Sequence, residues 1–368
     1  MSHDSSLLKL MTRYKDQFKA YLGLLICWIV LLALTTHYSR DYFNYHCWFN
    51  TALVLSPGER FFGLHSLVRD PAYSMLQALG TLFLPFEVFF AALILLALSI
   101  KFFALKRLVP TLSFLYVLPY FMVLSFLHEG TQIRIALALS VALWSLIWFA
   151  QGRRKQSLLL LCFACAFHLS AATFFLVFLL KGLYDRYGTR LLIALGVFGV
   201  ILAYTGLVQE MLMWLGDKTN ARYMAYSVGA IYHRQNSTGL FAYFPLFVGA
   251  LTLLVWKIYQ PIQPAWQELK KMALISGFLA IVILGIFRFN VVIASRLADL
   301  LLLPVVLVLG AALVQLVEQK RRFLLAVLIL LLLAYGGARG LVTYLPAPNY
   351  VYFCPSDSKL NEDRKNAQ

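Results

Sequence analysis

The feature that most constrains this chain is a series of long apolar runs separated by short and mostly basic segments. Many runs extend over about 18 to 25 residues, which is long enough for an α-helix to cross a bilayer. Their apolar residues do not alternate with polar ones, as the strands of a membrane β-barrel would require. At 61% hydrophobic and 13% charged, the 368 residues are too apolar for a soluble enzyme. The sequence therefore predicts an all-α, polytopic bundle of about nine to eleven membrane segments.

Most of the lysine and arginine residues fall in short loops, which the positive-inside rule places on the cytoplasmic side of a membrane. This distribution accounts for the formal charge of +16 and argues against a nucleic-acid partner. Four basic residues precede the first apolar run and predict a cytoplasmic N-terminus. That run begins near Tyr21 and lacks a small-residue cleavage site, so we expect a membrane span there and no cleaved signal peptide.

The distribution of polar segments predicts one integral membrane domain over residues 1–345. It carries two outer loops, at 38–71 and 207–239, and the first is long enough to act as a functional loop or a lid. Residues 72–84 are too short to span and predict a short helix at the outer interface. We expect residues 346–368 to form a partly disordered tail on the outer side.

Residues 156–180 are long enough to span, yet basic clusters flank them on both sides, at 152–155 and 181–190. Both flanks therefore predict a cytoplasmic location. A re-entrant pair of half-helices that meet near His168 would explain both the length of the segment and its two cytoplasmic flanks, since about 12 residues reach about 18 Å into the bilayer. Broken helices at this depth line a cavity. The alternative is a straight span next to a wrongly assigned neighbour.

Ionisable residues inside apolar runs predict a functional site, because an unpaired charge there costs several kcal/mol. Arg134 lies about one helical turn below the outer surface, and His168 lies deep in the re-entrant segment. Arginine suits the fork-like recognition of phosphate oxygens. A cluster of arginines at the lipid–water boundary therefore suits a lipid with a diphosphate head group. The candidates are Arg134, Arg288 and Arg296 within the spans and Arg222 in the second loop. For Arg296, pairing with Asp299 on its own helix face is the alternative.

Aromatic residues in the outer loops suit stacking against sugar rings. The candidates are Tyr42, Tyr45, Trp48, Tyr223 and Tyr226, and the alternative role for each is an interfacial aromatic belt. We find no metal-binding, nucleotide-binding or serine-hydrolase motif, and we therefore expect neither a metal nor a cofactor.

Taken in order, several short motifs resemble the EpsG family of membrane proteins, which belongs with the Wzy-type polymerases of bacterial surface polysaccharides. The resemblance covers most of the chain, but Leu169 stands where the family pattern often has proline. The matching motifs are Asp41-Tyr42, Arg69-Asp70-Pro71, Arg134-Ile135-Ala136, Phe167-His168-Leu169-Ser170, and Arg296-Leu297-Ala298 ahead of Pro304.

The resemblance implies a metal-independent glycosyltransferase in the bacterial plasma membrane. Such an enzyme joins oligosaccharide units carried on undecaprenyl diphosphate into exopolysaccharide, capsule or O-antigen at the outer face. Arg134 and Arg296 would bind the diphosphate, and His168 would act as base or as a hydrogen-bond donor. The alternative for His168 is a packed core histidine. Glu129 and Asp41 are further candidate bases. Expected partners are the lipid-linked donor, the bilayer, and the machinery of polysaccharide export and chain-length control.

Three other functions fit parts of the pattern. An O-antigen ligase uses the same donor, although ligases usually carry one large outer loop late in the chain. A flippase or transporter would show inverted repeats with matching broken helices, and we find one candidate break without a counterpart. A membrane acyltransferase would need a histidine with acidic companions, for which His128-Glu129 is a weak candidate.

Cysteine positions give one further expectation. Cys47 lies in the first outer loop and Cys354 in the outer tail, so both would face an oxidising compartment in which a disulfide persists. We expect either a Cys47–Cys354 bridge or two unpaired thiols.

Overall fold

The computed structural model describes residues 22–23, 25–33, 40–62, 70–109, 113–219 and 244–344. Within these ranges the chain forms helices and connecting segments and no strand, which confirms the all-α prediction. Its contacts divide the chain into two compact units. Unit 1 comprises residues 1–145, 155–171 and 316–368, and unit 2 comprises residues 146–154 and 172–315.

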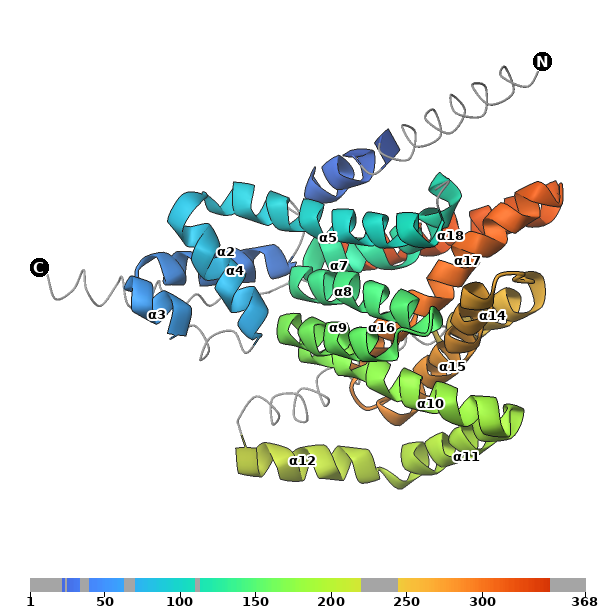
Figure 1. Cartoon of the computed structure of the whole chain (residues 1–368). Coiled ribbons are helices and arrows are strands. Elements are labelled where there is room, and N and C mark those ends of the chain that lie inside the picture. The colour runs from blue at the N-terminus through green and yellow to red at the C-terminus, as the bar shows by residue number, and fades with distance from the viewer. Residues whose placement is uncertain are drawn as a thin grey trace, which may run out of the picture. The chain divides into compact units, whose positions relative to one another are not determined.

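Three of the described helices are long and apolar enough to cross a membrane: α5 (Phe86–Leu108), α8 (Ile133–Ala150) and α15 (Pro264–Ile286). Two further pairs of helices are bent at a short break, and each pair could form one more span. The bend is 63° between α11 (Thr189–Thr205) and the start of α12 (Leu207–Thr219), and 42° between α16 (Val291–Leu301) and α17 (Leu303–Glu318) (Figure 1). The described part of the chain thus holds up to five spans by length and composition. The total of nine to eleven stays a prediction.

The described part of the first predicted outer loop is largely helical, and its location on the outer side stays a prediction. It contains α2 (Arg40–Leu53) and α3 (Pro57–Phe62), and the predicted short helix follows as α4 (Pro71–Phe83). Tyr42, Tyr45 and Phe49 of α2 pack edge-on or tilted against Phe86 and Phe90 of α5. Burying a large side chain contributes about 1.5–3 kcal/mol, so these rings stabilise a helix that the mixed polar sequence alone does not reveal.

The apolar run at 110–127 is long enough to predict a span, but its described part, residues 113–127, is not one helix. Its described part is a 3₁₀ turn at Phe114–Tyr116, the short α6 (Leu118–Tyr120), a π-turn η3 (Phe121–Ser125) and α7 (Phe126–Thr131). Pro119 lies in the first turn of α6, where its missing amide is tolerated. The π-turn contacts α18 (Arg322–Tyr344), so close packing replaces a regular helix here.

The segment around His168 is interrupted at the predicted place. α9 (Arg154–Phe167) ends just before this residue, a 3₁₀ turn η4 follows at Leu169–Ala172, and α10 (Thr173–Tyr187) begins after it. At 1.5 Å per residue each helix is only about 21–23 Å long, shorter than a hydrocarbon core of about 30 Å. Whether the two helices return to the same side of the membrane stays a prediction.

Unit 2 contains α10, α11, α12, α14 (Phe244–Ile258), α15, α16 and α17. A ring of four charged residues joins the end of α10 to the start of α15: Lys181 and Lys271 each pair with both Asp185 and Glu268. These two helix ends therefore lie on the same side of unit 2. Burial raises the pKa of Asp185, but hydrogen bonds from Lys181 and Lys271 outweigh this effect and leave the pKa below its usual range.

Candidate active site

The candidate site is centred on Arg134, the second residue of α8. Its Nη1 lies 2.5 Å from Oδ2 of Asp70, which immediately precedes α4. The Arg134 and Asp70 side chains keep only 23% and 10% of their accessible surface. The Nε of Arg134 is buried and has no hydrogen-bond partner among the described residues. This guanidinium therefore retains an unused donor in a mostly buried position.

Two aromatic rings of α2 line the guanidinium of Arg134. Its Cζ lies 5.1 Å from the ring centroid of Trp48 and 5.9 Å from that of Tyr45. These two residues are three apart on α2 and so occupy one face of the helix. A cation within about 6 Å of an aromatic ring is attracted by the ring's negative face. Tyr45 also shares a side-chain hydrogen bond with Arg134, so it holds the guanidinium through both its ring and its hydroxyl.

Asp70 connects Arg134 to the interruption near His168. The backbone amide of Leu169 donates a hydrogen bond to the Asp70 carboxylate. Burial raises the pKa of Asp70, and the charge of Arg134 and this amide only partly offset that effect. Residues from α4, α8 and η4 therefore meet at one carboxylate.

His168 itself is half-buried and interacts with Ser170. Its Nδ1 lies 2.5 Å from the Ser170 hydroxyl and accepts a hydrogen bond from the Ser170 backbone amide at 3.3 Å. An accepting Nδ1 assigns the proton of the neutral ring to Nε2. Ser170 therefore fixes the orientation of the His168 ring.

A model of the EpsG family matches residues 20–345, nearly the whole chain. The chain belongs to the EpsG family. Comparisons with curated proteins and with solved structures return no match. The resemblance stated above is thereby confirmed. Together with the apolar helices, membership in this family indicates a polymerase-like membrane protein with a role in polysaccharide production.

One departure from the EpsG pattern has a physical consequence in this chain. Leu169, at a position where the family often has proline, uses its amide to bind Asp70. A proline has no such N–H. The Asp70 carboxylate of this EpsG member is therefore held by a donor that the more usual residue could not supply.

The other predicted residues of unit 1 occupy different surroundings. The sequence predicts Glu129 in an outer turn between two apolar runs, but it lies in α7, where it is fully buried and pairs with Lys101. Tyr42 and Tyr45 are 9% and 3% exposed, so both are packed inside unit 1. Asp41 is half-buried in the first turn of α2 and acts electrostatically on Tyr45.

The predicted arginines of unit 2 lie in two places. Arg288 is exposed beside a cavity of about 430 Å³ and lies 5.3 Å from the ring centroid of Tyr204. Arg296 is half-buried on α16, and Asp299 on the same helix is fully buried. The roles of both arginines in diphosphate binding stay predictions, and Arg222, Tyr223 and Tyr226 lie outside the described residues.

Of the two cysteines expected to form a disulfide, only Cys47 is among the described residues. Cys47 is disulfide-bonded, whereas Cys27, Cys162 and Cys165 are free thiols. Cys354, the predicted partner of Cys47, lies outside the described residues. Since Cys47 precedes Trp48, the disulfide is attached to the helix that covers Arg134.

Sequence reasoning did not select Asp70 as a site residue, and it proposed Trp48 for sugar stacking and not for contact with Arg134. A signal for Asp70 was present, because an acidic residue directly before Pro71 marks a helix start in the same predicted outer layer as Arg134. Trp48 carried no distinguishing signal among the many aromatic residues of 38–71. Its role depends on which face of α2 packs toward α8, and this is set by tertiary contacts.

Proposed function

We propose that this EpsG family member is a glycosyltransferase that polymerises oligosaccharide units carried on undecaprenyl diphosphate. The observation that carries the proposal is the buried guanidinium of Arg134, whose Nε donor is unused among the described residues. A buried donor without a partner is costly, and a phosphate oxygen would satisfy it through a charge-assisted hydrogen bond. Family membership supplies the polysaccharide context.

In the proposed reaction, a hydroxyl of one lipid-linked unit attacks the anomeric carbon of another. The new C–O bond forms as the bond to undecaprenyl diphosphate breaks, and the bonding electrons leave with the diphosphate. Arg134 stabilises the negative charge on this leaving group. His168, whose ring is held by Ser170, remains the candidate hydrogen-bond donor to the diphosphate.

The hydroxyl proton needs an acceptor. We assign this role to Asp70, because it contacts Arg134 and because burial raises its pKa, which makes its carboxylate more basic than usual. Asp41 remains the alternative base on α2. Glu129 is less suited, since it is fully buried and both of its oxygens accept hydrogen bonds within the protein.

The disulfide at Cys47 supports an outward-facing location for this site. Disulfides persist in oxidising compartments, and Cys47 adjoins the residue that stacks on Arg134. A site open to the outer face is where lipid-linked units are joined in the proposed reaction.

The test uses the full-length protein in nanodiscs with a synthetic undecaprenyl-diphosphate oligosaccharide, and it follows polymer length by gel electrophoresis. We expect Arg134→Lys to lower the turnover at least tenfold, because lysine keeps the charge but loses the planar fork. Arg186→Lys is the matched control, since Arg186 also lies over a ring, that of Tyr187, but is exposed in unit 2. It should retain wild-type turnover.

Several outcomes would contradict the proposal. Normal polymer from a folded Arg134→Lys protein would remove Arg134 from the reaction. Transfer only to a lipid A–core acceptor would identify a ligase. Movement of the lipid-linked unit across the bilayer without any new glycosidic bond would identify a flippase.

A further inference from the structure

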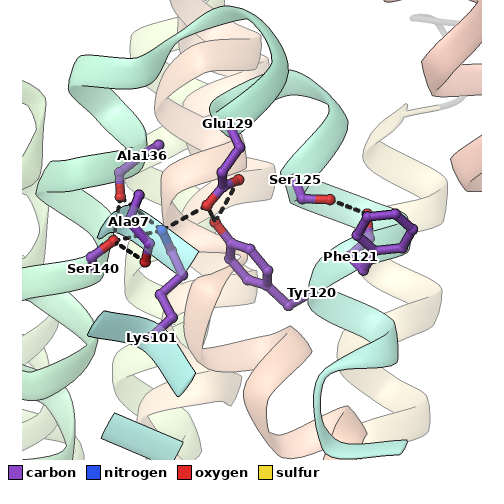
Figure 2. A network of polar contacts seen from close by, with 8 residues as sticks. All are labelled: Ala97, Lys101, Tyr120, Phe121, Ser125, Glu129, Ala136 and Ser140. Atoms are coloured by element: carbon purple, nitrogen blue, oxygen red, sulfur yellow. Dashed lines mark hydrogen bonds and ion pairs between the residues drawn. The ribbon is translucent and has the colours of Figure 1, made fainter. Parts of the chain in front are cut away.

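A second polar cluster of unit 1 lies around Lys101, in the middle of the apolar helix α5. The Lys101 ammonium donates to Oε1 of Glu129 at 2.7 Å, to the carbonyl of Ala136 at 2.8 Å and to the Ser140 hydroxyl at 2.6 Å. An ammonium has three N–H groups, so all three are used. Figure 2 shows these contacts converging on the lysine from α7 and α8.

The remaining contacts complete the cluster. The Tyr120 hydroxyl lies 2.9 and 3.1 Å from the two carboxylate oxygens of Glu129 (Figure 2). The Ser140 hydroxyl lies 2.9 Å from the carbonyl of Ala97 on α5 and 2.7 Å from that of Ala136. The cluster thus links α5, α6, α7 and α8 through paired and buried groups.

The depth of this pair differs from the sequence expectation. In the sequence, Lys101 lies near the basic residues Lys106 and Arg107 at the end of one apolar run, and Glu129 lies in a short polar stretch between two others. Both positions predict a location near a membrane surface. In the structure their side chains keep 5% and 0% of their accessible surface and contact each other directly. A buried ion pair of this kind often adds little to stability compared with apolar residues of similar size. A purely stabilising role is therefore a poor explanation for it.

The position of the contacts along the chain indicates another role. α7 ends at Thr131, the backbone of the next residue, Gln132, is not helical, and α8 starts at Ile133. Lys101 holds Glu129 before this break and the carbonyl of Ala136 after it. Arg134 lies between the two anchored points, so Lys101 contacts both sides of the short segment that carries the candidate catalytic arginine.

We propose that Lys101 is a positioning residue that fixes the junction of α7 and α8 and thereby sets the place of the Arg134 guanidinium against Trp48. Glu129 supplies the opposite charge, and Tyr120 and Ser140 fix the orientation of the pair. The importance of this position for catalysis rests on the proposed function, whereas the geometric effect does not.

The test reads the position of Arg134 directly. The protein is labelled with 5-fluorotryptophan, and the ¹⁹F resonance of Trp48 is assigned from its loss in Trp48→Phe. Arg134→Met gives the position of this resonance without the cation. The test variants are Lys101→Met/Glu129→Gln, which removes both charges together and leaves no unpaired ion, and Lys101→Arg, which keeps the charge but changes its reach.

Both variants should move or broaden the Trp48 resonance and reduce polymer formation at least tenfold at an unchanged level of folded protein. The control is Ser145→Ala/Ser157→Ala, which removes another buried hydrogen-bonded pair that joins α8 to α9. It should leave the resonance and the activity unchanged.

The outcomes separate the two proposals. A wild-type Trp48 resonance in either folded variant overturns the positioning role of Lys101. A displaced resonance confirms that role even if the wild-type protein makes no polymer, in which case it is the proposed function that fails.

Discussion

Gly336 on α18 provides the sharpest test of how unit 1 packs. A Cβ added at this position would lie 2.7 Å from the backbone carbonyl oxygen of Met122 and 3.3 Å from its Cα. Ordinary contacts of a Cβ begin near 3.4 Å, so α18 or the π-turn would have to move by roughly 0.7 Å. Overpacking of this kind costs about 1–3 kcal/mol. We therefore expect Gly336→Ala to destabilise the protein.

The neighbouring Gly337 provides the matched control, because a Cβ there would meet nothing within 4 Å. Alanine favours helix over glycine equally at both positions, by about 1 kcal/mol, so the difference between the two variants isolates the steric cost. The folded-to-unfolded ratio of Gly336→Ala should be about 5- to 150-fold lower than that of Gly337→Ala. Unfolding by SDS in mixed micelles measures this ratio. Equal stability of the two variants would refute the close contact between α18 and the π-turn.

Three further predictions concern single contacts. Leu169→Pro should lower the affinity for a diphosphate lipid, measured by binding in nanodiscs, because Asp70 loses its amide donor; unchanged affinity would contradict that contact. Cys47 should resist a thiol reagent until reductant is added, and labelling without reductant would exclude the disulfide. Asp185 should stabilise the folded state above its unfolded pKa of about 4, and this contribution should vanish as pH falls through the lower folded pKa. The difference in stability between wild type and Asp185→Asn should therefore disappear below about pH 4. A difference that grows on acidification would show that folding raises the pKa of Asp185 instead of lowering it.

The sequence predicts the helices that depend on apolar length alone. The helices α5, α8 and α15 follow from uninterrupted apolar runs, because backbone groups in hydrocarbon must be satisfied within the helix. The interruption near His168 could also be predicted, since basic segments on both flanks leave no room for a simple crossing. These features are local or depend on the charge of neighbouring segments.

Contacts between distant residues could not be predicted in the same way. The helix α2 is stabilised by aromatic rings that pack against Phe86 and Phe90 of α5. The sequence of 38–71 alone does not indicate these contacts. Lys101 and Glu129 illustrate the same limit, because each reads as a residue at the end of a span when considered alone. Arg134 was found as a charge in an apolar run, whereas Asp70 became part of the site only through its contact with that arginine.

The discontinuous course of unit 1 has a consequence for its biosynthesis. Unit 2 is complete once residue 315 has been made, but unit 1 also requires residues from 316 onward. Met122 meets Gly336 only after about 210 further residues, which takes roughly 10–40 s at a synthesis rate of about 5–20 residues per second. During this interval the nascent chain holds the Arg134 region without its α18 support. A ribosome that terminates before α18 would therefore release a chain in which unit 2 is complete and unit 1 lacks its C-terminal part.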